Sequence, residues 1–219
     1  MDELEGKKYY VAIAGNIGVG KTTLTEALAR QLGWRSYFEP VINNPYLDDF
    51  YADMSRWAFH LQVYFLSKRF ESQRSILVEN ESSIQDRTIY EDVEIFATTL
   101  HKRGHLTGRD WENYCDLFHA MTSFLKSPDL ILYLRCDVPT LLHRIHHRGR
   151  ESEKSITASY LGELNDAYEE WAKRASTLSR FAILDTAGSH EIDKEQVLDR
   201  ALELLKTRLQ LEIPFATRR

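Results

Sequence analysis

The chain has 219 residues, of which 43% are hydrophobic and 28% charged, so it can form one full-sized domain with a buried core but not two. Its net charge of −5 argues against a nucleic-acid partner, because proteins that bind DNA or RNA are usually basic. It has no signal-peptide stretch, no apolar run of the roughly 18 residues that cross a membrane, and no close cysteine pair, so we expect a cytoplasmic protein without a membrane partner.

Short apolar runs with strand character alternate with stretches of helical periodicity. The first run, residues 9–14, predicts a buried strand that ends at Gly15, and a helix is predicted over residues 22–32. Further strands are predicted at residues 36–39, 83–86, 130–136 and 181–185. Further helices are predicted at residues 45–52, 56–79, 90–103, 109–126, 139–147, 157–176 and 194–209. This alternation predicts an α/β fold in one domain over residues 1–219: a parallel five-stranded sheet with helices on both faces and ligands at the carboxyl ends of the strands.

The segment between the first strand and the first helix matches the G-x-x-x-x-G-K-[ST] pattern of a phosphate-binding loop, or P-loop. It consists of Gly15, Asn16, Ile17, Gly18, Val19, Gly20, Lys21 and Thr22, followed by Thr23. Glycines let backbone N–H groups point at phosphate oxygens, Lys21 can reach the β- and γ-phosphates, and the Thr22 hydroxyl can hold Mg²⁺. The alternative is a chance glycine-rich turn, but the flanking strand and helix favour an ATP site.

Glu39 ends the second predicted strand and comes directly before Pro40. A carboxylate at this position faces the P-loop from the neighbouring strand. It can act as general base toward a hydroxyl acceptor, which must lose a proton as it attacks, whereas a nucleoside monophosphate acceptor is already an anion. The alternative is an ordinary strand-end carboxylate that caps a turn.

Asp86 and Arg87 stand at the end of the third predicted strand. Asp86 is expected to assist Mg²⁺, and Arg87 to steady the reacting phosphate or the acceptor oxygen. The alternative is a polar helix start in which Thr88 serves as N-cap.

Three arginines, Arg144, Arg148 and Arg150, surround the expected end of a helix at Gly149. Beside a P-loop they predict an arginine lid, over about residues 148–155, that closes on the transferring phosphoryl group. Taken alone, the same residues would be an exposed basic helix end.

Together these segments resemble the deoxyribonucleoside kinase family over most of the chain, which implies a P-loop kinase fold. The resemblance rests on the P-loop with Thr23, on Glu39-Pro40, and on the segments 44–47, 57–62, 86–92 and 143–150. The run Asp-Arg-Thr-Ile-Tyr-Glu-Asp from Asp86 looks closest to the bacterial deoxyadenosine kinases. Much of the animal family has Glu where Asp86 stands and Ser where Thr88 stands.

The resemblance implies a role for each matching residue. Glu39 would be the general base toward the 5′-hydroxyl, with Arg87 beside it and Lys21 on the phosphates. Tyr51 and Glu153 would hold the sugar 3′-hydroxyl. The residues assigned to the base are Gln62, which pairs with its edge, Phe96, which stacks on it, and the charged pair Arg69 and Asp92 at the far end of the pocket.

Helical spacing is compatible with these roles, because Gln62 and Arg69 share one helix face, and Asp92 and Phe96 share another. Without the resemblance, Gln62 and Arg69 could equally face solvent, and Phe96 could be a core residue. A buried Arg69–Asp92 pair crowds a thymine methyl group, so we expect purine deoxynucleosides or deoxycytidine as substrates and poor use of thymidine. Among these candidate substrates, the resemblance to bacterial deoxyadenosine kinases favours deoxyadenosine.

The sequence therefore predicts a kinase of nucleotide salvage that uses ATP and Mg²⁺ to phosphorylate the 5′-hydroxyl of a deoxynucleoside. The alternatives are a deoxycytidine or deoxyguanosine kinase, a nucleoside monophosphate kinase such as thymidylate kinase, and, in another class, an ATP-dependent regulatory switch protein.

Two further features concern helix packing and metal binding. An apolar stripe along the 109–126 helix predicts core packing, and the resemblance implies that this helix and the 56–79 helix also bury against a second subunit in a homodimer. The cluster His143, His146 and His147 fits no standard zinc pattern, so it is not taken as a metal site.

Overall fold

The computed structural model describes residues 7–38, 44–79, 81–150, 153, 155–178, 180–187 and 193–211. Glu39 and positions 151, 152 and 154 of the expected lid lie outside these residues.

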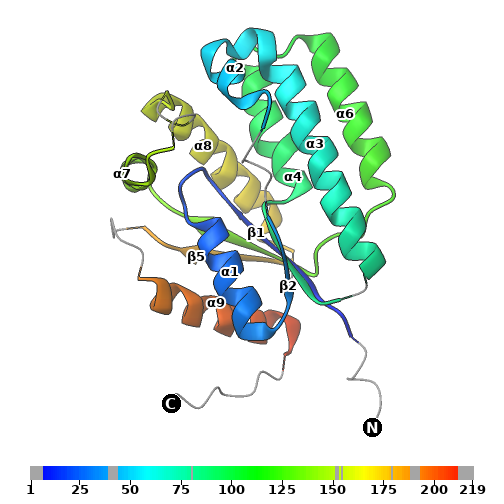
Figure 1. Cartoon of the computed structure of the whole chain (residues 1–219), viewed down its shortest axis with the longest axis vertical. Coiled ribbons are helices and arrows are strands. Elements are labelled where there is room, and N and C mark those ends of the chain that lie inside the picture. The colour runs from blue at the N-terminus through cyan, green and yellow to red at the C-terminus, as the bar shows by residue number, and fades with distance from the viewer. Residues whose placement is uncertain are drawn as a thin grey trace.

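The described residues contain one sheet of five parallel strands (Figure 1). The strands are β1 (Tyr10–Gly15), β2 (Arg35–Tyr37), β3 (Ser83–Asp86), β4 (Leu130–Arg135) and β5 (Phe181–Asp185), in the spatial order β2-β3-β1-β4-β5. This confirms the predicted fold class. β2 begins one residue earlier than predicted, and Phe38 lies beyond its end. As an edge strand, β2 pairs only with β3.

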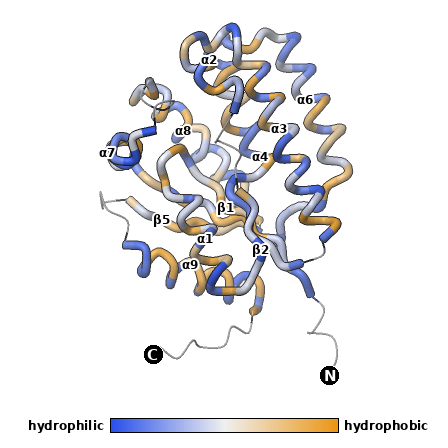
Figure 2. Tube along the Cα trace, viewed as in Figure 1, coloured by the Kyte–Doolittle hydropathy of each residue, from blue (hydrophilic) through white to orange (hydrophobic). Residues whose placement is uncertain are grey.

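Helices cover both faces of the sheet. α1 (Lys21–Leu32) and α9 (Lys194–Leu209) lie on one face, where they share a buried cluster with Val11, Ile13 and Leu184. α3 (Met54–Glu79) and α8 (Ala158–Ala175) lie on the other face, against the alternate strand residues Tyr10, Ala12, Tyr133 and Phe181. Figure 2 shows hydrophobic residues concentrated on the central strands and alternating with polar ones along the helices.

The remaining helices stand around the carboxyl edge of the sheet and beside α3. They are α2 (Leu47–Ala52), α4 (Ile89–Glu91), α5 (Thr98–Lys102), α6 (Gly108–Thr122) and α7 (Val138–Arg148). Residues 123–126 were predicted to continue α6 but lie outside it. The hydroxyl groups of Thr122 and Ser123 donate to the carbonyl groups of Phe118 and Ala120, which favours termination at this point.

The prediction of one regular α-helix over residues 90–103 is wrong about the middle of this segment. Its middle is a π-helix, η1 (Asp92–Ala97), between α4 and α5. The backbone N–H of Thr98 donates to the carbonyl group of Val93, five residues earlier, and the Thr98 hydroxyl donates to the same carbonyl at 2.7 Å. Such wider turns occur mainly at functional sites, and this one carries two of the predicted base-pocket residues, Asp92 and Phe96.

Neither a membrane-crossing helix nor a disulfide occurs in the described part of the chain. None of the helices found there combines the length and the apolar character that a bilayer span demands. Cys115 and Cys136 are both free thiols.

Candidate active site

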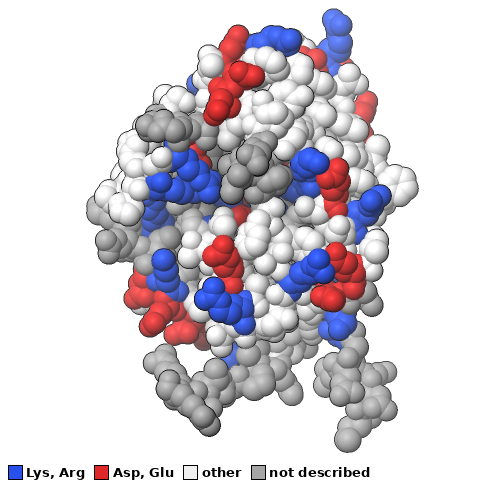
Figure 3. Space-filling model, in the orientation of Figure 1, with Lys and Arg blue, Asp and Glu red and all other residues white. Residues whose placement is uncertain are grey.

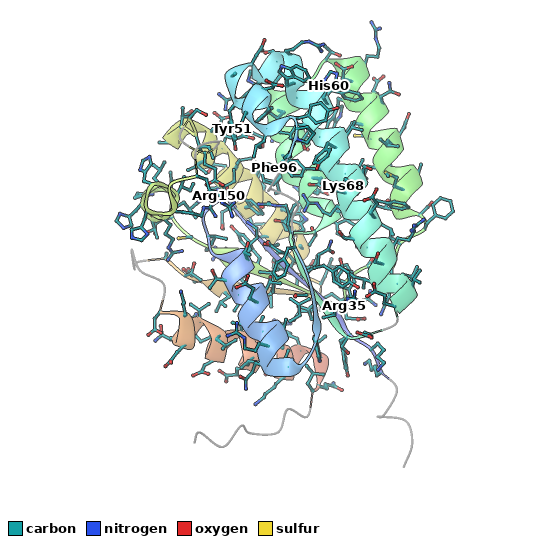
Figure 4. The ribbon with its side chains drawn as sticks, in the orientation of Figure 1. Arg35, Tyr51, His60, Lys68, Phe96 and Arg150 are labelled. Carbon is teal, nitrogen blue, oxygen red and sulfur yellow. The ribbon has the colours of Figure 1, made fainter. Side chains whose placement is uncertain are left out.

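A cavity of about 520 Å³ opens at the carboxyl ends of β1 and β3. Most of the predicted site residues line it: Ile17, Gly18, Gly20, Lys21, Thr22, Thr23, Tyr51, Gln62, Arg69, Asp86, Arg87, Asp92, Phe96, Arg148, Arg150 and Glu153. In Figure 4, Tyr51 of α2, Phe96 of η1 and Arg150 after α7 stand around this space. Segments far apart in the sequence thus meet in one cavity, as expected from the parallel topology.

Two glycines of the P-loop stand where a side chain would not fit. Gly18 has φ of +84°, and a Cβ at this position would lie 2.7 Å from Ile145 Cγ1. At Gly15 a Cβ would approach the carbonyl oxygen of Leu134 in β4 to 2.8 Å. Lys21 is buried, and its Nζ donates to the carbonyl groups of Gly15 at 2.8 Å and Asn16 at 3.0 Å. The loop is therefore wrapped around the lysine, with α1 starting behind it.

The Thr22 hydroxyl donates to Asp86 Oδ2 at 2.5 Å. Thr22 lies in the first turn of α1, the helix that follows β1, and Asp86 ends β3, the strand that pairs with β1. A hydroxyl oxygen and a carboxylate oxygen on the cavity wall are hard oxygen ligands of the kind that Mg²⁺ prefers when the other positions are filled by phosphates and water. The described residues contain no group of three or more His, Cys, Asp or Glu side chains that could bind a metal by itself.

Arg87 has an unusual backbone conformation, and its guanidinium contacts several neighbouring side chains. Its φ is +71°, which is uncommon for a residue with a side chain and is concentrated at functional sites. The guanidinium carbon lies 4.6 Å from the centroid of the Phe96 ring, and Nη1 donates to the hydroxyl of Tyr168 at 2.8 Å and to Glu91 Oε1 at 3.2 Å. Arg87 thus presents its charge at the cavity wall in one fixed orientation.

The far end of the cavity carries a buried ion pair and an amide. Arg69 Nε and Nη2 donate to Asp92 Oδ2 at 2.6 Å and Oδ1 at 2.8 Å, with both side chains 2% exposed. Gln62, 3% exposed, lies on the same face of α3 and also lines the cavity. Its Oε1 has no hydrogen-bond partner among the described residues. A buried amide oxygen is costly to leave unpaired, which makes Gln62, in the wall of the cavity, a candidate for a ligand contact.

The basic residues after α7 converge on one carboxylate. α7 ends at Arg148, and Gly149 takes the left-handed conformation that stops it, with φ of +69°. Arg148 and Arg150 both donate to Glu153, which is 6% exposed. Figure 3 shows Lys and Arg side chains gathered on the side of the molecule where α7 lies. This positive region borders the mouth of the cavity and suits a polyphosphate.

Four predicted site residues within the described part of the chain do not line this cavity. Gly15, Asn16 and Val19 belong to the loop but do not line the cavity. Arg144 does not line it either: Nη1 lies 3.4 Å from the Val19 carbonyl and Nη2 donates to the Thr186 carbonyl at 3.1 Å. A second hollow of about 340 Å³, lined by Val19, Gly20 and Thr186, lies on this side of the loop.

Sequence reasoning missed two kinds of residue at the site. The apolar wall of the cavity includes Leu47, Phe50, Leu61, Phe65 and Tyr160. Periodicity places such residues inside, but it cannot tell a cavity wall from a packed core. The second kind supports the site from behind. Glu91 and Tyr168 bind the P-loop and Arg87, and only the pattern Thr88-x-x-Glu91, a capping box confirmed at α4, could have drawn attention to either of them.

The family model, the similar sequences and the similar solved structures all belong to deoxynucleoside kinases. A family model for deoxynucleoside kinases matches residues 11–206. A deoxyadenosine/deoxycytidine kinase of Bacillus subtilis (strain 168) is 44% identical over 167 residues, which cover 75% of this chain and 77% of the relative. A deoxyadenosine kinase of Dictyostelium discoideum is 42% identical over 195 residues, covering 89% of this chain and 77% of the relative. A solved structure of deoxyadenosine kinase from M. mycoides with bound dCTP has a TM-score of 0.79 at 30% identity, and covers 90% of this chain and 99% of that one.

Proposed function

The chain belongs to the deoxynucleoside kinase family, and we propose that it phosphorylates deoxyadenosine in preference to other deoxynucleosides. As a member of this family it is an enzyme that transfers a phosphoryl group from ATP to a deoxynucleoside. The preference is supported by the relatives named for deoxyadenosine and by the chemistry of the base pocket. The product, a deoxynucleoside 5′-monophosphate, fits a role in cytoplasmic nucleotide salvage.

The buried, unpartnered amide oxygen of Gln62 is the observation that carries the proposal. A glutamine amide accepts through Oε1 and donates through Nε2. Adenine presents an N1 acceptor beside an exocyclic amine, so it satisfies both groups of the amide at once, and cytosine presents the corresponding pair. Thymine can also pair with the amide, through its N3–H donor and O4 acceptor, so we ascribe poor use of thymidine to crowding of its methyl group by the buried Arg69–Asp92 pair. Deoxycytidine and deoxyguanosine remain the nearest alternative substrates.

The remaining site residues divide into two groups around the reacting atoms. Glu39 takes the proton of the 5′-hydroxyl, Arg87 stabilises the charge that develops on the transferring group, and Tyr51 and Glu153 hold the sugar. Lys21, the P-loop amides and the arginines Arg148 and Arg150 neutralise the ATP phosphates. The contacts of Arg148 and Arg150 with Glu153 support this division, because they join the lid to the sugar site.

Mg²⁺ would be held by Thr22 and Asp86 together with phosphate oxygens. When bound, it would neutralise the charge of the β- and γ-phosphates. The hydrogen bond between the two side chains fits this role, because it brings both oxygens to one point.

The experiment that tests the substrate preference supplies ATP, Mg²⁺ and each of the four deoxynucleosides in turn and measures ADP release. We expect the highest kcat/KM with deoxyadenosine and the lowest with thymidine. A preference for thymidine contradicts the pocket assignment. ADP release with dTMP but with no deoxynucleoside favours a monophosphate kinase, and release that is independent of any acceptor favours a switch protein.

The chain contains a matched control for the base-pocket amide. Gln62 and Gln73 are both buried glutamines of α3, 3% and 2% exposed, but only Gln62 lines the cavity. We expect Gln62→Leu to lower kcat/KM for deoxyadenosine by about 10²-fold, because the base edge loses two hydrogen bonds of about 1–1.5 kcal/mol each. Gln73→Leu should leave the ranking of the four deoxynucleosides unchanged.

We also propose that the enzyme is a homodimer that pairs through α3 and α6. These helices pack together at the side of the molecule away from α9 (Figure 1), and large apolar side chains are exposed near their ends. Val78 is 75% exposed and Phe124 is 74% exposed. The apolar stripe of α6 packs in the core, as predicted, since Tyr114 and Phe118 are buried within the chain.

Light scattering tests the dimer. We expect twice the chain mass of 25.6 kDa for the native protein, and the monomer mass for Phe124→Asp. Leu178→Asp is the control, because Leu178 is 60% exposed but follows α8 at a different surface. A native protein that remains monomeric at micromolar concentration contradicts the proposal.

A further inference from the structure

Glu91 and Tyr168 form a buried bridge between the P-loop and Arg87, although neither lines the active-site cavity. Both are fully buried, Glu91 in α4 and Tyr168 in α8. We infer that they are positioning residues, which hold the Arg87 guanidinium in a fixed relation to the phosphate loop so that the acceptor and donor halves of the site stay in register.

Glu91 collects donors from three segments of the chain. Its Oε1 accepts from the backbone N–H of Gly15 at 3.0 Å, from Arg87 Nη1 at 3.2 Å and from the Tyr168 hydroxyl at 2.6 Å. Its Oε2 accepts from the backbone N–H of Thr88 at 2.6 Å, which closes the capping box. A buried carboxylate is stable only when its oxygens are satisfied in this way, so its position is tightly determined.

The Tyr168 hydroxyl lies at the centre of the same network. It accepts from Arg87 Nη1 at 2.8 Å and lies 2.8 Å from the carbonyl oxygen of Gly15 and 2.6 Å from Glu91 Oε1. Its single hydrogen serves one of these two acceptors at a time. Burial raises the pKa of Tyr168 well above its usual value, so the hydroxyl remains a neutral donor at every working pH.

The support behind the hydroxyl is rigid. The Tyr168 ring stacks on Tyr133 with centroids 5.3 Å apart and an interplanar angle of 7°. One helical turn away on α8, Asn165 accepts from the P-loop residue Asn16 at 2.7 Å and donates to the Cys136 carbonyl at 2.8 Å. Since the Leu161 carbonyl also accepts from Asn16, at 3.1 Å, α8 contacts the loop through three residues.

The arrangement serves orientation more than stability. The ring stack on Tyr133 also holds Tyr168, and loss of the Tyr168 hydroxyl leaves Glu91 Oε1 with two donors, the Gly15 N–H and Arg87 Nη1, so the buried carboxylate stays paired. From the left-handed backbone of Arg87, the side chain runs over Phe96 to the bridge, where Nη1 contacts both Glu91 and Tyr168. Because a displacement of about 1 Å at a reacting group can lower a rate by about 10²-fold, loss of the bridge is expected to affect turnover before it affects folding.

The test compares Tyr168→Phe with Tyr133→Phe, two variants that each remove one hydroxyl from the same ring stack. The Tyr133 hydroxyl donates to Glu169, away from the cavity, so Tyr133→Phe is a matched control. The assay uses whichever deoxynucleoside proves the best acceptor, which keeps the outcome independent of the deoxyadenosine preference. We expect Tyr168→Phe to lower kcat by about tenfold with KM for both substrates within about threefold, at the same melting temperature as the control.

A double-mutant cycle with Arg87→Lys separates positioning from a structural role. The lysine lacks the forked guanidinium that the bridge orients, so in this background Tyr168→Phe is expected to lower kcat by less than about threefold. A kcat equal to that of Tyr133→Phe, or an equal loss in both backgrounds, overturns the inference. If Tyr168→Phe melts far below the control, the cycle is repeated with Glu91→Gln, where coupling to Arg87 supports the inference and additive losses overturn it.

Discussion

The hydroxyl of Thr22 and the carboxylate of Asp86 meet at 2.5 Å across a sequence separation of 64 residues. The contact joins the first turn of α1 to the end of β3 and marks the point where the phosphate side of the cavity meets the acceptor side.

We expect Asp86→Asn to raise the Mg²⁺ concentration needed for half-maximal activity by about 10–100-fold, because a carboxylate that orients or binds the ion is replaced by a neutral amide. The measurement is a Mg²⁺ titration of the initial rate at saturating ATP. Asp185→Asn is the control, since Asp185 ends β5 and does not line the cavity. An unchanged titration midpoint argues against the metal assignment.

Gly18→Ala is expected to weaken ATP binding. The added Cβ would lie 2.7 Å from Ile145 Cγ1, and the left-handed backbone adds strain of about 1–3 kcal/mol, so the loop must move. KM for ATP reports the effect. The matched substitution Gly162→Ala, inside α8 with nothing near its Cβ, is expected to stabilise the protein by about 0.5–1 kcal/mol and leave KM for ATP alone.

Asp92→Asn is expected to lower the free energy of unfolding by about 3–5 kcal/mol, because it leaves the buried charge of Arg69 without its counter-charge. Urea denaturation measures the loss. Glu169→Gln breaks the Arg135–Glu169 pair, whose side chains are each 37% exposed, and is expected to cost only about 0–1 kcal/mol. Equal losses in the two variants would contradict the assignment of a dry pocket at Asp92.

Glu39→Gln is expected to lower kcat by about 10²–10⁴-fold with deoxyadenosine, because the 5′-hydroxyl loses its general base while the shape of the side chain is retained. The fall in kcat is expected to exceed any rise in KM. Glu81→Gln serves as control, since Glu81 precedes β3 at the opposite edge of the sheet. A kcat close to that of the native enzyme rules Glu39 out as the base.

Tyr37 is expected to make the stability of the protein depend on pH. This dependence reports on β2, the strand that precedes Glu39 in the sequence. Burial, followed by a hydrogen bond to Glu79, raises the pKa of Tyr37 to about 12 from 10.0. Because the pKa is higher in the folded state, this contribution to stability is complete below pH 10 and is lost as the pH rises toward about 12. Solvent screening keeps it small. We expect the melting temperature of Tyr37→Phe to fall less over this range than that of the native protein, and identical slopes would contradict the contact.

Hydrophobic periodicity and residue propensity were sufficient to predict the fold class and the order of its strands and helices along the chain. Strand-forming runs and leucine spacing predicted the strands and most helix bounds, because hydrophobic periodicity follows directly from which face of an element is buried. The π-turn of η1 escaped this reasoning, since apolar spacing does not distinguish a hydrogen bond to the fourth preceding residue from one to the fifth. β2 was misplaced by one residue because an edge strand has a weak pattern.

The sequence by itself determined the phosphate loop, since the spacing of its glycines, Lys21 and Thr22 is a local property of a strand–turn–helix segment. Only the tertiary structure decided which distant side chains share the cavity and which stand behind it. Gln62 and Phe96 could have been surface or core until α3 and η1 were packed together. The bridge of Glu91 and Tyr168 to Gly15 joins residues whose proximity depends on the packing of α8 against the sheet, and no local pattern encodes that distance.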